Sequence, residues 1–160
     1  MPRAFFADTK KVEIWRGSMN AASGSAIVSA NTGFIEFNTV STTDSAGAIF
    51  SLVALASNGG VRILKPGFVY VEANQDIISS GASSYLTMQV YNSGSSRGLQ
   101  LITHTNGQWD GLMIGTGFPV AANDTVQFSI ANGDILSIDT GTGYGSWSNY
   151  SIIWYGLAEE

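Results

Sequence analysis

Few residues in this chain have the types and spacing that catalysis requires. His104 is the single histidine, and it lies in a strand-like segment, Leu99 to Thr105, with no serine or carboxylate pattern beside it. A histidine that acts as a general base needs a second side chain to orient it. We therefore expect a structural or surface role for His104 and predict that the protein is not an enzyme.

Three aspartates in turn regions come nearest to a metal site. Asp110, Asp134 and Asp139 could meet at one end of a β domain, but their spacing fits no calcium-binding loop. Turn aspartates more often cap backbone amides. The chain has no cysteines, which excludes disulfides and thiolate metal sites. The sequence therefore predicts no metal and no cofactor.

Two glycine-rich stretches have the composition of phosphate-binding loops. They are Gly115-Thr116-Gly117 and Gly141-Thr142-Gly143-Tyr144-Gly145. A phosphate-binding loop of this kind needs a following lysine and a helix, and neither stretch has them. We expect both stretches to be plain loops.

Trp109 and Trp147 could bind a ligand without catalysing a reaction. Both lie beside glycine and polar residues in predicted loop regions. An exposed tryptophan can stack on a sugar ring, whereas one at the rim of a sheet or at a subunit interface packs against protein. Both interpretations stay open, and we keep Trp109 and Trp147 as possible glycan contacts.

Composition limits the classes of partner that the protein can bind. The 160 residues are 44% hydrophobic and only 12% charged, which is typical of one folded β domain and not of a disordered chain. Residues 1–16 carry four basic and two acidic residues, whereas the remainder carries three basic and ten acidic ones. The acidic body would repel nucleic acid. No apolar run reaches the roughly 18 residues of a membrane helix, and we expect neither a nucleic-acid nor a membrane partner.

Short strands separated by turn residues dominate the chain from Ala26 onward. No segment has a helical apolar period, and Asn-Gly pairs are suited to tight hairpins. This pattern predicts an all-β fold, an antiparallel jelly-roll sandwich of about ten strands. The candidate strands are Ala26–Ala30, Gly33–Val40, Ala48–Leu55, Val61–Leu64, Phe68–Ile78, Tyr85–Asn92, Leu99–Thr105, Leu112–Ile114, Thr125–Ala131, Ile135–Ile138 and Tyr150–Leu157.

The first half of Phe68–Ile78 and the whole of Tyr150–Leu157 are apolar on both faces. A strand that is buried on one side alternates apolar with polar residues, so these two strands need a cover on each side. We expect a second subunit to supply one cover. The period does not tell which face looks inward, so candidates come from both faces. The predicted interface residues are Phe68, Tyr70, Tyr150, Ile152, Trp154 and Tyr155.

Residues 1–25 differ from the rest and are predicted to form an N-terminal arm and linker ahead of a domain at residues 26–160. One interpretation is an arm that docks on a partner, because exposed aromatic side chains mark contact surfaces. The other is that Val12, Ile14 and their neighbours form a first strand packed on the body. The arm residues expected to contact a partner are Arg3, Phe5, Phe6, Lys10, Lys11 and Trp15.

A series of turns and strands in the sequence carries a family resemblance. It comprises Asp124 to Phe128, the turn Asn132-Gly133-Asp134, the strand Tyr150 to Leu157, and an earlier Pro66-Gly67 turn into an aromatic strand. In this order, residues 33–157 resemble the globular head of complement component one q and the tumour necrosis factor-like jelly rolls. The resemblance implies a ten-stranded jelly roll that forms a tight homotrimer about an aromatic axis.

The chain departs from secreted members of that family, since it lacks cysteines and a collagen-like repeat. Its glycine-, serine- and asparagine-rich sequence with a short arm looks more like a bacteriophage virion protein. The resemblance implies a capsid decoration (cement) protein on the capsid exterior, whose arm binds the major capsid protein. The alternative is a receptor-binding knob of a phage fibre that engages a cell-surface glycan. A fibre usually needs a long shaft, so the short arm favours decoration.

Overall fold

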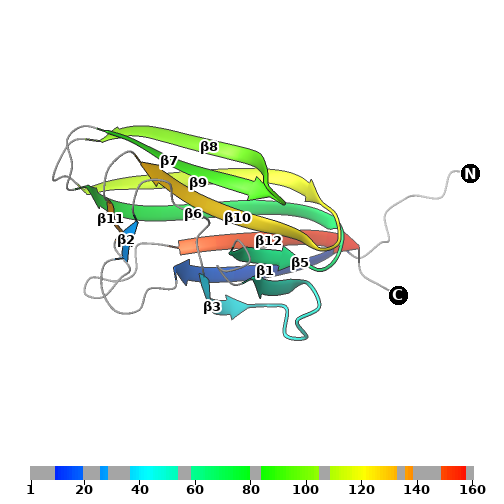
Figure 1. Cartoon of the computed structure of the whole chain (residues 1–160). Coiled ribbons are helices and arrows are strands. Elements are labelled where there is room, and N and C mark those ends of the chain that lie inside the picture. Colours follow the sequence, from blue (N-terminus) through cyan, green and yellow to red (C-terminus); the bar gives the residue numbers. More distant parts are fainter. Residues whose placement is uncertain are drawn as a thin grey trace, which may run out of the picture.

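The computed structural model describes residues 10–19, 26–28, 37–53, 59–79, 84–104, 109–132, 136–138 and 149–157. These residues form an antiparallel β sandwich, and the predicted all-β jelly roll is confirmed (Figure 1). The strands are β1 (Lys10–Met19), β2 (Ala26–Val28), β3 (Phe37–Thr42), β4 (Phe50–Val53), β5 (Gly60–Ile63), β6 (Gly67–Ser79), β7 (Ser84–Asn92), β8 (Ser95–His104), β9 (Trp109–Val120), β10 (Asp124–Asn132), β11 (Leu136–Ile138) and β12 (Asn149–Leu157).

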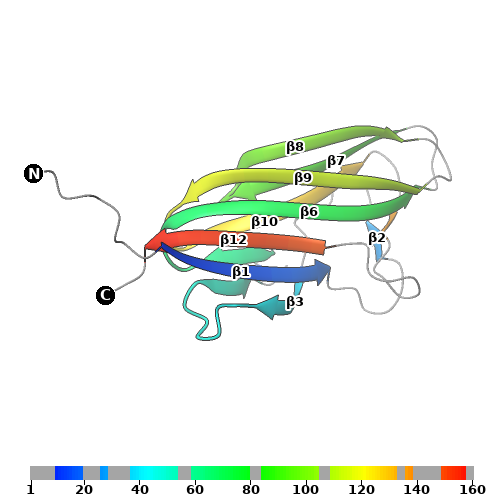
Figure 2. The same cartoon turned by 180° about the vertical axis from the view of Figure 1, so that it is seen from behind.

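The strands lie in two sheets. The seven-stranded sheet has the order β2-β11-β6-β12-β1-β3, and β9 pairs with the edge of β6 opposite to β12. The five-stranded sheet has the order β4-β5-β10-β7-β8. Figure 2 looks onto the first sheet, where β9, β6, β12 and β1 run side by side. Lys10 pairs with Leu157, so β1 begins and β12 ends at the same end of the sandwich.

The β7–β8 hairpin shows how turn residues set the register. Asn92 pairs with Ser95 across a two-residue loop, in which Ser93 and Gly94 have positive φ angles of 48° and 83°. Such a turn matches the right-handed twist of the strands, and glycine adopts the conformation without strain. The turn follows the predicted strand Tyr85–Asn92, and β8 begins at Ser95, four residues before the predicted strand Leu99–Thr105.

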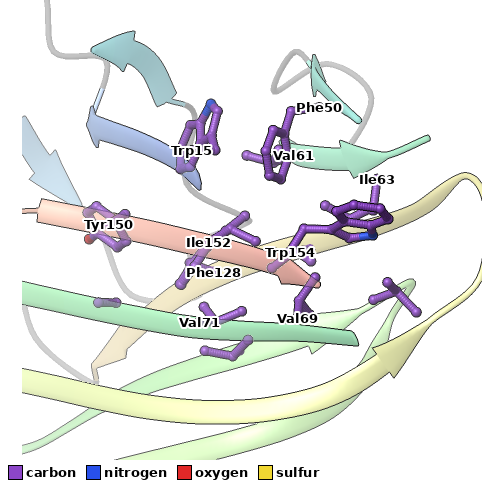
Figure 3. Close-up of a cluster of buried hydrophobic side chains, with 14 of the residues drawn as sticks. Trp15, Phe50, Val61, Ile63, Val69, Val71, Phe128, Tyr150, Ile152 and Trp154 are labelled. Atoms are coloured by element: carbon purple, nitrogen blue, oxygen red, sulfur yellow. The ribbon is translucent and has the colours of Figure 1, made fainter. Parts of the chain in front are cut away.

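An aromatic cluster joins the two sheets in the core (Figure 3). Phe37 packs edge-on against Trp15, Phe128 and Tyr150, with ring centroids 5.4, 5.4 and 4.8 Å away. Each such pair contributes roughly 0.5–1.5 kcal/mol beyond the burial of its surface. The cluster draws its side chains from β1, β3, β10 and β12, so it ties strands from distant parts of the sequence together.

Residues 10–19 correct the predicted boundary between arm and domain. They form β1, which lies between β12 and β3 inside the seven-stranded sheet, and Trp15 is 2% exposed. The arm interpretation is wrong for this segment, and the alternative of a first strand packed on the body is confirmed. Arg3, Phe5 and Phe6 lie outside the described residues.

Strand β9 is much longer than the predicted Leu112–Ile114 and includes both glycines that were expected in a loop. A Cβ atom on Gly115 would lie 2.8 Å from the Tyr70 hydroxyl, and one on Gly117 would lie 2.8 Å from the Phe68 ring. The rings of β6 therefore lie across the glycines of β9. This cross-strand contact explains why glycine occupies the middle of a strand, and the loop prediction is wrong here.

Candidate interaction surface

The first half of strand β6 is apolar on both sides, but only one of these sides lies in the core. Val69 and Val71 point into the core and are fully buried, whereas Phe68 and Tyr70 point outward and are 45% and 38% exposed. A large aromatic side chain that stays exposed on a regular sheet is typical of a contact surface.

The neighbouring strands continue the outward apolar surface. Tyr155 is the register partner of both Phe68 on β6 and Val12 on β1, so the three side chains share one face. Among the described residues, seven large hydrophobic side chains are exposed, and five of them lie on this face. We call it the outer face: the outward side chains of β9, β6, β12 and β1, namely Met113, Gly115, Gly117, Phe68, Tyr70, Glu72, Ser151, Ile153, Tyr155, Val12, Ile14 and Arg16.

The structure separates the six predicted interface residues into two sets. Tyr150, Ile152 and Trp154 lie in the core, where 0%, 0% and 2% of their surface is exposed, so their assignment to a subunit interface is wrong. Burial also raises the pKa of the Tyr150 phenol, which keeps it neutral. Phe68, Tyr70 and Tyr155 lie together on the outer face, which makes them the predicted candidates that remain available for contact.

One end of the outer face is polar. Arg16 on β1, Ser151 on β12 and Glu72 on β6 are register partners across three neighbouring strands. A hollow of about 330 Å³ is lined by these three residues together with Ile14, Asn149, Tyr150 and Ile153. A second hollow of about 400 Å³ adjoins it and is lined by Tyr70, Glu72, Met113 and their neighbours. Glu72 and Asn149 line both hollows.

The carboxylates near the turns serve the fold. Asp44 is buried and accepts hydrogen bonds from the backbone N–H groups of Ala48, Ile49 and Phe50 at 3.0, 2.6 and 3.0 Å. Burial raises its pKa, but the backbone donors outweigh burial and leave the pKa below its usual range. Asp44 therefore acts as a cap of backbone amides.

Asp124 has the same role at the turn before β10. Its carboxylate accepts hydrogen bonds from the Ala121 N–H and from the Asn92 side-chain amide, both at 2.9 Å. Burial raises its pKa, and these donors more than compensate, so the pKa lies below its usual range. Such a carboxylate stays ionised and does not exchange protons near neutral pH.

Of the predicted arm residues in the described part of the chain, Lys11 is exposed and pairs with Glu13 at 3.0 Å, while Trp15 is in the core. Glu13 also accepts a hydrogen bond from Thr43, and this bond and the Lys11 contact lower its pKa. Lys10 begins β1, but its side chain lies outside the described part.

The remaining residues that the sequence analysis considered for catalysis, metal binding or glycan contact lie at strand ends or outside the described residues. Trp109 begins β9, Asp110 follows it and His104 ends β8, and the side chains of all three lie outside the described part. Trp147, Asp134 and Asp139 lie outside the described residues. Within the described ranges, no three His, Cys, Asp or Glu side chains gather closely enough to hold a metal ion. These residues also contain no helix with the length and apolar character that crossing a bilayer requires.

No family model matches the sequence, and no curated protein sequence matches it. Solved structures do match. Eiger TNF from S. frugiperda is 13% identical, with a TM-score of 0.61 over 92% of this chain and 94% of that chain. Murine APRIL is 10% identical, with a TM-score of 0.59 over 90% of this chain and 99% of that chain. At these identities the similarity establishes the fold alone, which is a tumour necrosis factor-like jelly roll.

Proposed function

We propose that the protein is a non-enzymatic structural protein that works as a homotrimer assembled through the outer face. The observation that carries this proposal is the group of exposed apolar side chains on one sheet, which includes Phe68, Tyr70 and Tyr155. Full burial of a side chain of this size contributes roughly 1.5–3 kcal/mol. Association that covers several such side chains in each copy can offset the entropy lost when the copies come together.

A trimer is also the assembly that the tumour necrosis factor-like resemblance implies, with an aromatic sheet facing the axis. The two structural neighbours support the fold on which this implication rests. In this proposal the core residues Tyr150, Ile152 and Trp154 hold the sheet rigid. The outer face then presents a fixed surface whose side chains lose little conformational freedom on binding.

The trimer can be tested with one substitution and a matched control. Light scattering on the wild-type chain should give a mass of about 50.7 kDa, three times 16.9 kDa. Tyr70→Glu places a charge in the proposed interface and should reduce the mass to that of one chain. Leu99→Glu changes an exposed apolar residue on β8 of the other sheet and should leave the trimer intact. A wild-type monomer, or a trimer that is insensitive to Tyr70→Glu, contradicts the proposal.

We propose further that the trimer decorates the exterior of a bacteriophage capsid and binds the major capsid protein. The glycine-, serine- and asparagine-rich, cysteine-free composition supports this role. The arm residues Arg3, Phe5 and Phe6 precede β1 in the sequence, so in this proposal attachment occurs at the end of the sandwich where β1 begins and β12 ends.

The attachment test must leave β1 in place. Removal of residues 1–20 would delete a strand from the middle of the seven-stranded sheet, so loss of binding would then report only unfolding. Removal of residues 1–9 is the sharper variant. It should abolish sedimentation with empty capsids while light scattering still reports a trimer, and retained capsid binding contradicts the arm hypothesis.

A second candidate function is a receptor-binding knob. Tyr155 pairs with Phe68 at the start of β6, which lies at the end of the sandwich where β1 begins and β12 ends. Trp109 pairs with Ile78 at the other end of β6. A knob anchored where β1 begins would therefore present the end that carries Trp109 to a host cell. In this case the purified protein should attach to host cells, and Trp109→Ala or Trp147→Ala should block the attachment. That result would favour receptor binding over decoration.

A further inference from the structure

The polar end of the outer face carries two opposite charges in fixed positions. Arg16 and Glu72 are both exposed, and each is the register partner of Ser151 on the strand between them. Two strand spacings separate them, which is roughly 10 Å between Cα atoms. Side chains on a sheet stand roughly perpendicular to it, so the two groups point outward on either side of the 330 Å³ hollow.

Neither charge is compensated within the described part of the chain. Lys11 and Glu13 form an ion pair elsewhere on β1, and it involves neither Arg16 nor Glu72. Arg16 and Glu72 also adjoin the apolar side chains proposed as the interface: Ile14 lies beside Arg16 on β1, and Tyr70 lies beside Glu72 on β6. Association through those side chains would bring both charges into or next to the buried area.

A buried charge without a partner strongly weakens association. Neighbouring copies of the same chain bring the missing partners, because in a ring one neighbour presents a Glu72 for Arg16 and the other presents an Arg16 for Glu72. We propose that Arg16 of one copy pairs with Glu72 of the next copy and that these pairs set the register of the assembly. The inference rests on the proposed homotrimer and names the polar contact that accompanies its apolar interface.

The pair explains why the face carries polar residues at one end. Apolar contact alone is non-directional and would tolerate sliding of one subunit along another. Charges placed on different strands allow one register, because any other register leaves them unpaired in a low-dielectric contact. Arg16 and Glu72 thus supply specificity, while Phe68, Tyr70 and Tyr155 supply the area.

Charge reversal tests this pairing directly. Arg16→Glu and Glu72→Arg should each weaken association at least about tenfold, because each places two like charges together. The double variant Arg16→Glu/Glu72→Arg should recover association to within a few-fold of wild type. Arg62→Glu reverses an exposed arginine on β5 of the other sheet and should have no effect. The readout is the dissociation midpoint by analytical ultracentrifugation, with circular dichroism to confirm the fold of each variant.

The outcomes separate this pairing from the trimer itself. If Tyr70→Glu dissociates the assembly but the single reversals do not, or if the double variant stays dissociated, the pairing is overturned and the interface survives. An unchanged mass in the single reversals is also the result expected if the hollow holds a small ligand instead. If the wild-type chain is a monomer at all concentrations, the proposed trimer fails and the pairing falls with it.

An equimolar mixture of the two single variants tests whether the number of subunits in the assembly is odd or even. In the mixture, a contact between unlike variants pairs opposite charges, and a contact between like variants pairs equal charges. A ring of three has an odd number of contacts, so at least one stays repulsive and recovery should be partial. Full recovery in the mixture would support the pairing but overturn the threefold assembly.

Discussion

Asp44 fixes the turn ahead of β4 through its three backbone hydrogen bonds. Asp44→Asn removes the charge and leaves one oxygen for the N–H groups of Ala48, Ile49 and Phe50. We expect the free energy of unfolding to fall by about 1–3 kcal/mol, as for lost hydrogen bonds to a charged group. Urea unfolding at neutral pH measures it. Ser45→Ala, at an exposed position in the same turn, is the control and should have little effect.

The same carboxylate predicts a pH dependence. The pKa of Asp44 is lowered on folding, so its contribution is complete above about pH 5 and is lost as the pH falls through the unfolded-state pKa and then the folded-state pKa. The stability difference between wild type and Asp44→Asn should therefore shrink between about pH 5 and about pH 2. Urea midpoints over this range provide the measurement, and a difference that stays constant contradicts the assignment.

Trp154 fills the core at the end of β12 because two glycines make room for its indole. A Cβ atom on Gly156 would lie 1.9 Å from Trp154 Cη2, and one on Gly67 would lie 2.5 Å from its Nε1. We expect Gly156→Ala to lower the free energy of unfolding by about 2–3 kcal/mol, because the ring must move. In the control Ser51→Ala, at an exposed position on β4 of the other sheet, urea unfolding should show a loss of less than about 1 kcal/mol.

At the scale of elements, β1 is an interior strand of the seven-stranded sheet. Trp15 projects from it into the core against Phe37. Trp15→Ala should lower the free energy of unfolding by about 3–5 kcal/mol, the cost of a large cavity. Val12→Ala, on the outward side of the same strand, should cost less than about 1 kcal/mol. Urea unfolding of both in a Tyr70→Glu background removes any contribution from assembly, and a small effect of Trp15→Ala would contradict the central place of β1.

The pairing of β6 with β9 shows how one element shapes another. Tyr70 pairs with Gly117 and Phe68 pairs with Pro119, so the aromatic rings lie over the small residues of the edge strand. The rings thus gain neighbours while one side of each stays exposed. A flat aromatic surface of this kind is stiff, and it arises from the contact between the two strands.

At the scale of the whole molecule, assembly should stabilise the fold by mass action. Only folded chains assemble into the trimer. The melting temperature of the wild type should therefore rise by roughly 3–6 °C over about a hundredfold increase in protein concentration. Tyr70→Glu should melt at one temperature throughout this range. Differential scanning calorimetry makes the comparison, with Leu99→Glu as the control that keeps the wild-type dependence. A wild-type melting temperature that is independent of concentration would count against assembly.

The sequence by itself determined the class of fold, because its signals are local. Alternation with period two marks the strands, and residues such as Ser93 and Gly94 supply the positive φ angles of a tight hairpin. It also showed that the first half of Phe68–Ile78 and the strand Tyr150–Leu157 are apolar on both sides. These features depend only on residues that are near one another in the chain.

Only the tertiary structure decided which side of each strand faces the core. The period of two separates the side chains into two faces but does not show which face lies in the core. Tyr150 and Tyr155 were therefore equally good candidates for the interface until the structure placed β12 between β6 and β1. The glycines of β9 looked like a loop because the rings that cover them belong to β6. Trp15 looked like part of an arm because its neighbour Phe37 lies in another strand. Each of these facts depends on contacts between distant residues, and the pattern along one strand does not contain them.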